Sequence, residues 1–418
     1  MTSGIRTSTS PIDAGMGKLP RAEGRTSRPM HLLLEHLLSS LSRGCLHVRL
    51  PNGQSLTAQG AEGGPEATLI LHRWRPLIRM VLRGDIGFAE SYRDGDWSSP
   101  DLTALLSLGI LNESAWAETL SVRWPLNLLL RLGHRRRDND ERGSRRNIAF
   151  HYDLGNAFYE QWLDEDLIYS SGIFRQETDS LEAAQANKLA AVLDLLQLPD
   201  TPCQVLEVGC GWGALACCIA SRSPASVAGI TLSTEQLAHA QARAAREGLA
   251  ERLDLRLQDY RHVQGSFDRI VSVEMVEAVG ERHWPTYFAT LRDRLRPGGH
   301  AVIQSITIGD AYFDHYRENV DFIQRFIFPG GMLPSPGALA REAKRAGLAF
   351  EVAETFGKSY AATLVEWRRR FHAAWPEIRA LGFDDAFGRL WDYYLSYCEA
   401  GFLSGRVDVG LYVLRRPG

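Results

Sequence analysis

The stretch Val205-Leu-Glu-Val-Gly-Cys-Gly-Trp-Gly213 determines the fold that this sequence predicts. An apolar strand pattern leads into a turn with three glycines, and Ala214-Leu-Ala216 continues as a helix. Glycine allows positive φ angles and lets a ligand approach the backbone closely. A strand, a glycine turn and a helix in this order therefore indicate a ligand site at the carboxyl end of a strand. Dinucleotide-binding folds share such a turn, so the turn alone does not identify the ligand.

Short apolar segments recur on both sides of this turn, and helical stretches separate most of them. The strand candidates in this half of the chain are residues 204–208, 227–230, 254–257, 268–272 and 299–304. Their alternation with helices predicts an α/β fold with a doubly wound, mostly parallel sheet. Earlier in the chain, strand patterns at 45–50 and 67–72 and a helical pattern at 77–82 predict a small α+β domain.

The chain divides into four expected regions. They are a disordered tail (1–28), an amino-terminal α+β domain (29–112), a basic and apolar linker (113–146) and the α/β domain (147–418). In the linker, an apolar segment at 124–132 precedes several arginines, a combination that suits an anionic lipid surface. A solvated linker is the alternative interpretation.

Charge and cysteine usage limit the classes of partner and compartment. Residues 1–150 hold 20 Lys and Arg against 15 Asp and Glu, a net of +5, and the remainder holds 27 against 35, a net of −8. The overall charge of −3 indicates no nucleic-acid partner, whereas the basic front half is compatible with an anionic membrane surface. The six cysteines show no metal-ligand spacing, so we expect no metal site and a reducing compartment. Without a signal peptide or a spanning segment of ~20 apolar residues, the sequence predicts a cytoplasmic enzyme.

The spacing from Glu207 to Gly213 resembles the first motif of class I S-adenosylmethionine-dependent methyltransferases. The resemblance implies S-adenosylmethionine as cofactor and a Rossmann-like sheet. It also implies a set of cofactor-binding positions, most of which follow predicted strands: Tyr169, Ser170, Glu207, Gly209, Gly211, Gly213, Thr231, Gln236, Asp259 and Tyr260. Asp259 is a candidate acceptor for the adenine amino group, with a turn or helix-cap role as the alternative.

Longer segments resemble the cyclopropane-fatty-acyl-phospholipid synthases and the mycolic acid cyclopropane synthases. They include NIAFHYDLGNAFYEQWLDEDLIYSSGIF (147–174), SVEMVEAVG (272–280), FIFPGGMLP (326–334) and YYLSYCEAGF (393–402). The resemblance implies a helical lid, a lipid-associated amino-terminal domain, and methylation of the double bond of an unsaturated phospholipid acyl chain. Aromatic residues would exclude water and favour a cation, although each is also compatible with plain core: Tyr169, Phe174, Tyr316, Phe322, Phe326, Phe328 and Trp367.

The same resemblance implies a bound bicarbonate ion as the base that closes a cyclopropane ring. Glu277, Tyr360 and the backbone at Ile306 match three of its anchors. Cys398 matches a cysteine once considered catalytic in the family. No base or cation lies near Cys398 in sequence, so we interpret this thiol as structural.

Three substitutions relative to the family motifs leave the product open. Ser171 stands where the family has a cysteine, and Gln304 and Ala278 stand where it has histidines. Serine and glutamine still donate hydrogen bonds to an anion, which keeps ring closure as the first expectation. If the base is displaced, proton loss instead gives a methylene group, which a reductase partner would convert to a methyl branch.

Two further interpretations remain alongside acyl-chain methylation. One is a methyltransferase for a small soluble substrate, which the amino-terminal domain and the 326–334 segment disfavour. The other is a catalytically inactive lipid-binding scaffold, which the intact 205–213 motif and Glu277 disfavour. We expect an enzyme on the inner face of the membrane, and the residues do not decide whether it forms a homodimer.

Overall fold

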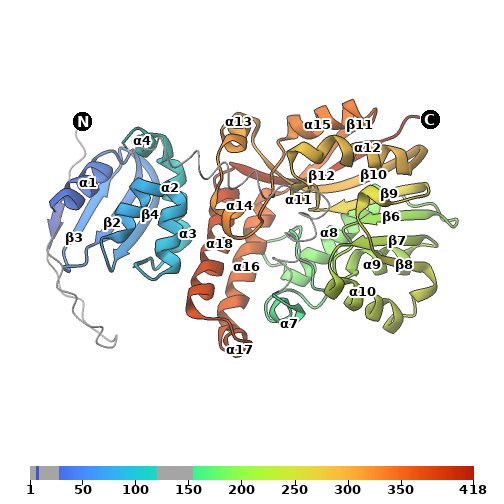
Figure 1. The fold of residues 1–418 in the computed structure, drawn as a ribbon, viewed down its shortest axis with the longest axis horizontal. Coiled ribbons are helices and arrows are strands. Elements are labelled where there is room, and N and C mark those ends of the chain that lie inside the picture. The colour runs from blue at the N-terminus through green and yellow to red at the C-terminus, as the bar shows by residue number, and fades with distance from the viewer. Residues whose placement is uncertain (1–5, 9–27, 120–153) are drawn as a thin grey trace. The chain divides into compact units, whose positions relative to one another are not determined.

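The computed structural model describes residues 6–8, 28–119 and 154–418 (Figure 1). The chain packs as two compact units. Unit 1 comprises Met1–Leu130 and Phe383–Ser404, and unit 2 comprises Arg131–Gly382 and Gly405–Gly418. Nearly all of the expected tail and most of the expected linker lie outside the described residues. The sequence-based division placed 383–404 with the α/β domain, whereas this segment packs within unit 1.

Unit 1 is a mixed α+β module. Its described strands follow the order β1-β3-β2-β4-β5. They are β1 (Arg6–Ser8), β2 (Arg43–Arg49), β3 (Ser55–Gln59), β4 (Glu62–Leu71) and β5 (Trp97–Ser98). Its helices are α1 (Arg28–Ser39), α2 (Arg75–Arg93), α3 (Leu102–Leu111), α4 (Glu113–Thr119) and α18 (Asp385–Leu403).

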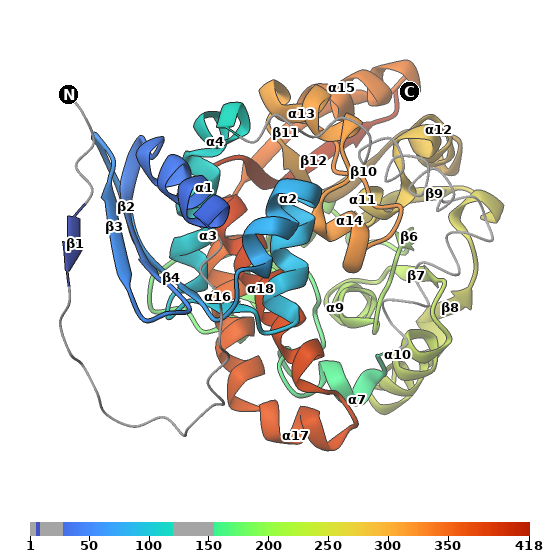
Figure 2. The same ribbon diagram turned by 60° about the vertical axis from the view of Figure 1, so that its left-hand side comes forward.

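The period-two pattern of β2 explains why helices cover one face of the unit 1 sheet. Leu46 and Val48 are buried, whereas Cys45 and His47 between them are half-buried. Helix α3 packs against β2 and β4, and Figure 2 shows the helices gathered on one side of these strands. The apolar face of the sheet is therefore the core of unit 1.

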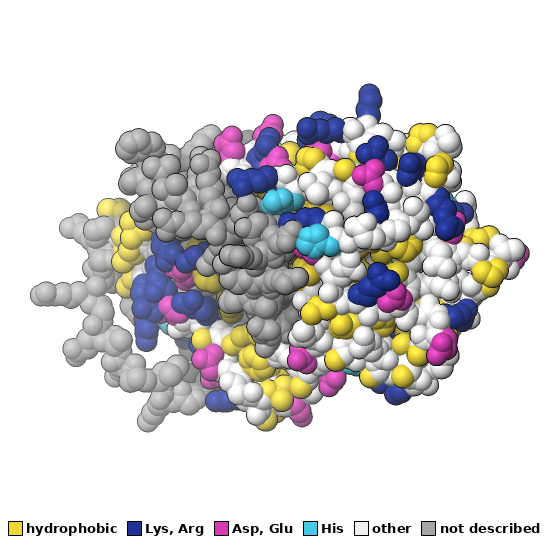
Figure 3. Space-filling model, turned by 45° about the vertical axis from the view of Figure 1, so that its right-hand side comes forward, with side chains coloured by type: hydrophobic (Ala, Val, Ile, Leu, Met, Phe, Trp, Pro, Cys, Tyr) yellow, Lys and Arg dark blue, Asp and Glu magenta, His cyan; other side chains and the backbone are white. Residues whose placement is uncertain are grey.

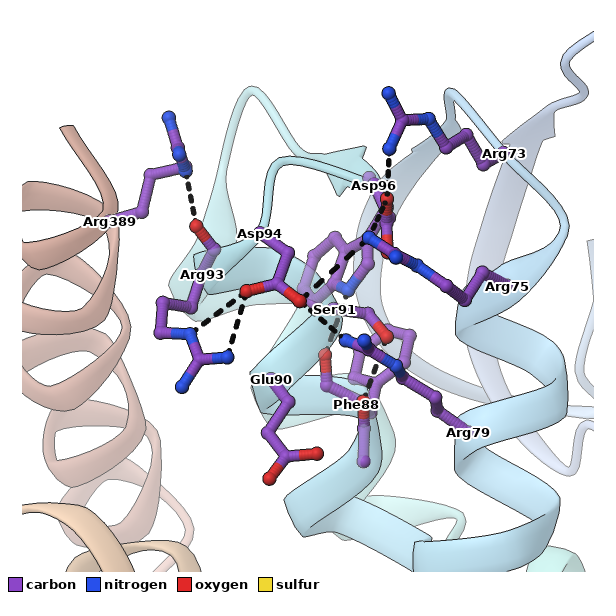
Figure 4. A network of polar contacts seen from close by, with 12 residues as sticks. Arg73, Arg75, Arg79, Phe88, Glu90, Ser91, Arg93, Asp94, Asp96 and Arg389 are labelled. Carbon is purple, nitrogen blue, oxygen red and sulfur yellow. Dashed lines mark hydrogen bonds and ion pairs between the residues drawn. The ribbon is translucent and has the colours of Figure 1, made fainter.

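A cluster of arginines and aspartates closes the turn between α2 and β5 (Figure 4). The Asp96 carboxylate is fully buried and accepts hydrogen bonds from Arg75 at 2.5 and 2.8 Å and from Arg73 at 3.2 Å. Asp94, which is more exposed, accepts from Arg79 at 2.7 Å. Charge-assisted bonds of this kind are stronger than neutral ones, so Asp96 holds the segment that follows α2 against the residues at the beginning of that helix.

Two buried hydrogen bonds join α18 to the rest of unit 1. The Tyr92 hydroxyl donates to Asp392 at 2.7 Å, and the Thr103 hydroxyl donates to Glu399 at 2.7 Å. The partners are about 300 residues apart in sequence, so this helix is a long-range component of the module.

Unit 2 contains a seven-stranded sheet in the order β11-β12-β10-β9-β6-β7-β8. Strands β10, β9, β6, β7 and β8 run parallel, while β12 pairs antiparallel with both β10 and β11. The strands are β6 (Gln204–Val208), β7 (Ser226–Thr231), β8 (Leu253–Leu257), β9 (Phe267–Val273), β10 (Leu295–Ile308), β11 (Ala349–Thr355) and β12 (Val407–Arg415). The predicted α/β class and doubly wound sheet are confirmed.

Helices cover both faces of this sheet in Figure 1. On one face lie α8 (Leu181–Leu196), α9 (Ala214–Arg222) and α10 (Thr234–Arg246), and on the other lie α12 (Trp284–Arg294) and α15 (Pro336–Arg345). The remaining helices of four or more residues in the described part of unit 2 are α7 (Asn156–Tyr159), α11 (Val276–Val279), α13 (Asp310–Glu318), α14 (Phe322–Phe326), α16 (Gly357–Ala373) and α17 (Trp375–Ala380). The carboxyl ends of the five parallel strands meet at one edge, where open α/β sheets bind ligands.

At the right of Figure 3, neither basic nor acidic side chains predominate on the surface of unit 2. Basic and acidic side chains are interspersed there with apolar ones. Within the described residues, no helix combines the length and apolarity needed to cross a membrane.

Candidate active site

The glycine turn after β6 has the backbone geometry that its sequence predicts. Gly209, Gly211 and Gly213 have φ angles of 87°, 51° and 86°, in the region that favours glycine. A Cβ on Gly213 would lie 2.9 Å from the Cβ of Ala240, so this glycine permits close packing of α9 and α10. A Cβ on Gly211 would meet no described atom within 4 Å, which leaves room for a ligand at that backbone.

Glu207, at the end of β6, provides an acceptor beside this turn. Its side chain is buried, and Oε2 has no hydrogen-bond partner among the described residues. Burial raises the pKa of Glu207 to about 8, although the nearby Lys188 ammonium opposes the rise. A buried, unpaired carboxyl oxygen carries a desolvation cost, so a ligand group that donates a hydrogen bond fits this position. The amino group of S-adenosylmethionine is such a donor.

The residues after β7 form a second part of the predicted cofactor site. The Thr231 hydroxyl donates to the Gln236 side-chain oxygen at 2.9 Å, and both residues are buried. Ser233 caps the amino terminus of α10 through a bond from the Gln236 backbone N–H. The fold thus brings Thr231 and Gln236 together, although their contact with a cofactor stays a prediction.

Asp259 and Tyr260 follow β8, as the sequence predicts. The Asp259 carboxylate caps a short 3₁₀ turn and accepts two side-chain bonds from Arg261, at 2.8 and 2.7 Å. Burial opposes ionisation of Asp259, but these bonds hold its pKa below the usual value. Asp259 therefore has the cap geometry of the alternative interpretation, and its contact with the adenine amino group stays a prediction. Burial raises the pKa of Tyr260 to about 12.

Lys188 on α8 connects several predicted residues through a fully buried ammonium group. Its Nζ donates to the Ser170 hydroxyl at 2.7 Å, and Gln185 donates to the Ser170 carbonyl at 2.8 Å. Burial lowers the pKa of Lys188 to about 8, and the carboxylates of Glu274 and Glu207 both act against this shift. Lys188 thus joins α8 to the segment that holds Ser170 and Ser171.

Glu274, immediately after β9, is the centre of that second group. Its Oε1 accepts from the Ser171 backbone N–H at 2.9 Å and from Gln304 Nε2 at 2.8 Å. Its Oε2 accepts from the Tyr360 hydroxyl at 2.8 Å. The φ angle of Glu274 is 47°, a left-handed conformation that costs a non-glycine residue of the order of 1 kcal/mol. Burial raises the pKa of Glu274, and the three hydrogen bonds oppose the rise.

Glu277 lies one helical turn further on and is held separately. Its Oε1 accepts from the Ile306 backbone N–H at 2.5 Å and from the Ser305 hydroxyl at 3.1 Å. Its Oε2 is buried without a hydrogen-bond partner among the described residues. Burial, and then the charge of Glu274, raise the pKa of Glu277 to about 8.

The family resemblance pointed to five candidate residues for the chemistry, and the structure gathers four of them at one edge of the unit 2 sheet: Glu277, Tyr360, Ser171 and Gln304. The fifth, Cys398, belongs to α18 in unit 1 and is half-buried. Glu274 and Lys188 were not predicted as site residues. The only sequence signal for Glu274 was a pair of glutamates three residues apart after a strand.

Aromatic rings adjoin this edge. The Tyr169 ring lies 5.3 Å from that of Trp367, and Trp367 is 6.1 Å from the Tyr360 ring, centroid to centroid. Phe322 and Phe326 pair separately at 5.5 Å around α14. Two of the seven predicted aromatic candidates, Tyr169 and Trp367, are thus packed together next to Tyr360.

Comparison with known proteins agrees with this geometry. The sequence profile of the mycolic acid cyclopropane synthetase family matches residues 139–411. This chain belongs to that family. A tuberculostearic acid methyltransferase of Mycobacterium tuberculosis is 40% identical over 375 residues, which cover 87% of this chain and 86% of the relative. A cyclopropane-fatty-acyl-phospholipid synthase of Escherichia coli is 37% identical over 345 residues, covering 81% and 85%.

Solved structures of the family share the fold of unit 2. A mycolic acid cyclopropane synthase in complex with SAH and CTAB superposes with a TM-score of 0.60 at 28% identity, covering 65% of this chain and 98% of that one. A cyclopropane synthase from Mycobacterium tuberculosis gives a TM-score of 0.60 at 26% identity, with the same coverage. The class I methyltransferase fold and S-adenosylmethionine as cofactor follow for this family member.

Proposed function

We propose that this protein transfers a methyl group from S-adenosylmethionine to the double bond of an unsaturated phospholipid acyl chain. The observation that carries the proposal is that Lys188 donates to the hydroxyl of Ser170 at 2.7 Å, while the backbone N–H of the next residue, Ser171, donates to Glu274 at 2.9 Å. This arrangement joins a cofactor site to buried carboxylates within one unit. The names of the two relatives described above support a lipid acyl chain as the substrate.

The site residues suit the charge changes of such a reaction. Bound S-adenosylmethionine supplies an electrophilic methyl group. When an alkene carbon of the acyl chain forms a bond to this methyl group, positive charge develops on the neighbouring carbon. The aromatic faces of Tyr169 and Trp367 attract a cation and keep out water. Buried carboxylates stabilise the same charge in a medium of low dielectric constant and provide a proton acceptor.

The fate of the cation distinguishes two products. Proton loss from the new methyl group closes a cyclopropane ring, the product named for the Escherichia coli relative. A hydride shift followed by proton loss gives a methylene group, which a reductase partner then converts to a methyl branch. The second product is favoured by two observations: Gln304 replaces the family histidine, and the tuberculostearic acid methyltransferase is 40% identical to this chain.

The test is an assay with liposomes of monounsaturated phospholipid and methyl-labelled S-adenosylmethionine, followed by mass spectrometry of the released fatty acids. The proposal predicts label in the acyl chain. A product one CH₂ heavier that resists hydrogenation is the ring, whereas a product that takes up hydrogen is the methylene chain. If no label enters the lipid, the proposal is contradicted. If the label enters a small soluble acceptor instead, methylation of that acceptor replaces the proposed reaction.

A phospholipid substrate also requires contact with the bilayer. We place the protein at the inner membrane surface, with unit 1 as its lipid-associated part. The net charge of +5 over residues 1–150 supports attraction to anionic headgroups, and most of this excess comes from residues 131–150, which hold seven Arg against three acidic residues. Co-sedimentation should therefore be stronger with anionic than with neutral liposomes and should weaken as salt is added. Equal binding to both kinds of liposome contradicts an electrostatic contact.

A further inference from the structure

The acid group at the end of β9 bears directly on how the acyl cation loses its proton. The family resemblance implies an exogenous bicarbonate ion held by the side chains or backbone of residues 171, 304, 306, 277 and 360. In this chain, three of those positions already donate to another group. The Ser171 N–H, the Gln304 amide and the Tyr360 hydroxyl all bond to the carboxylate of Glu274, at 2.8 to 2.9 Å.

The remaining backbone donor is also engaged. The Ile306 N–H bonds to Glu277 at 2.5 Å. The Ser171 hydroxyl, which replaces the family cysteine, donates to the Gly172 carbonyl at 2.9 Å. Bicarbonate therefore does not fit this set of residues, because its expected donors are bonded to the protein's own oxygens.

We propose that the Glu274 carboxylate takes the place of the exogenous anion and accepts the proton that the methylated acyl chain loses. This inference rests on the proposed function. A carboxylate offers about four lone-pair directions, and the three hydrogen bonds fill three of them. One direction on Oε2 is left for a proton. When a C–H bond of the acyl cation breaks, its electron pair forms the ring or the double bond, and the proton passes to Oε2 and then to solvent.

The backbone at Glu274 gives independent support. Its φ of 47° is costly for any residue with a side chain, and strained conformations of this kind cluster at functional sites. Glycine would adopt the same angle without cost. The backbone of Glu274 is strained, and its carboxylate accepts hydrogen bonds from three other segments. Glu274 is therefore a positioned group rather than a surface acid.

Glu277 is the competing proton acceptor, and its surroundings disfavour it. Its Oε2 is buried without a partner among the described residues, and burial together with the Glu274 charge favours its protonated form. Burial also raises the pKa of Glu274, but its three hydrogen bonds and the charge of Lys188 oppose this rise and favour a carboxylate. Of the two acids, Glu274 is the one held ready as a base.

The experiment compares wild type, Glu274→Gln and Glu274→Gly in CO₂-free buffer with and without added bicarbonate. Wild type should turn over equally in both buffers. Glu274→Gln keeps the shape but accepts no proton, so its kcat should fall by about 10²- to 10⁴-fold while the KM for S-adenosylmethionine stays unchanged. Glu274→Gly suits the left-handed backbone and exposes the three donors, so added bicarbonate should restore much of its activity.

The matched control is Glu351→Gln on edge strand β11, where the carboxylate is 60% exposed and activity should not change. A wild type that requires bicarbonate, or a Glu274→Gln variant with the wild-type rate, overturns the inference. Titration with ¹³C-bicarbonate followed by NMR, without cofactor or lipid, gives a second readout. If bicarbonate binds to Glu274→Gly and not to wild type, the inference is supported. If bicarbonate also binds to wild type at the three donors that the Glu274 carboxylate occupies, the inference is overturned. If wild type transfers no methyl group to lipid, the proposed function is contradicted instead. The titration then still tests whether Glu274 occupies the bicarbonate position.

Discussion

The Tyr360 hydroxyl donates a 2.8 Å hydrogen bond to Oε2 of Glu274 and so joins helix α16 to the residue that follows strand β9. This bond favours the ionised carboxylate, because a phenol donates to a charged oxygen more strongly than to a neutral one. The protonation of Glu274 is therefore linked to a side chain from a helix that begins more than 80 residues later in the sequence.

Replacement of Tyr360 by phenylalanine should raise the pKa of Glu274 further. A hydrogen bond to a charged group contributes about 1.5–3 kcal/mol, which corresponds to about one to two pKa units. The acidic limb of the kcat profile should then move to higher pH by that amount, with activity recovered at alkaline pH. A profile of kcat against pH for both proteins checks this. A uniform loss of rate without a shift of the limb would mean that Tyr360 acts on something other than Glu274.

Replacement of Glu277 by glutamine should make stability less dependent on pH. The folded-state pKa of about 8 lies above the ordinary carboxyl value of 4.5. Between these values the folded protein binds a proton that the unfolded chain releases, so wild-type stability falls as pH rises through this window. Glutamine does not titrate, so the variant should gain melting temperature relative to wild type between pH 5 and pH 8, by an amount on the order of 10 °C. Parallel melting curves across this range would contradict the burial of Glu277 as a neutral acid.

Sequence reasoning succeeded where the signal is local. The order of strand, glycine turn and helix at 204–222 sets its own backbone, and hydrophobic periodicity revealed β6 to β10. Strands β11 and β12 were not anticipated. The resemblance to a family also brought Ser171, Gln304 and Tyr360 into one site.

Features of the site and of unit 1 that depend on contacts between distant parts of the chain could not be predicted from the sequence. Glu274 is central because a left-handed φ turns its carboxylate toward donors from three segments, and neither the angle nor the donors can be inferred from the nearby sequence. Lys188 lies in a helix where a lysine is ordinarily exposed, yet it is buried among carboxylates. Helix α18 joins unit 1 through Tyr92 and Asp392, which are 300 residues apart.

Replacement of Asp96 by asparagine should destabilise unit 1. Its carboxylate is fully buried, whereas Arg73 and Arg75 remain 64% and 42% exposed and can be rehydrated. The loss should therefore be about 1.5–3 kcal/mol, the range for hydrogen bonds to a charged group, rather than that of an isolated buried charge. Hydrogen–deuterium exchange should become faster in α2 and β5. Asp94→Asn is the control, because Asp94 is 23% exposed and should show a smaller change. Equal effects of the two substitutions would contradict the special position of Asp96.

Alanine substitutions at two glycines of the turn after β6 should distinguish an effect on folding from an effect on ligand binding. An alanine at Gly213 meets the Cβ of Ala240 at 2.9 Å and has a φ of 86°, so Gly213→Ala should lower stability by about 2–4 kcal/mol through crowding and backbone strain together. An alanine at Gly211 meets no described atom within 4 Å, so Gly211→Ala should cost only about 1 kcal/mol of backbone strain.

The methyl group of an alanine at position 211 would project into the space left for a ligand, so the affinity of Gly211→Ala for S-adenosylhomocysteine should fall at least ~10-fold, equivalent to about 1.4 kcal/mol. Thermal unfolding without ligand and calorimetric titration with S-adenosylhomocysteine measure the two effects independently. Wild-type affinity in Gly211→Ala would place the cofactor away from this backbone, even if the larger loss of stability in Gly213→Ala is observed.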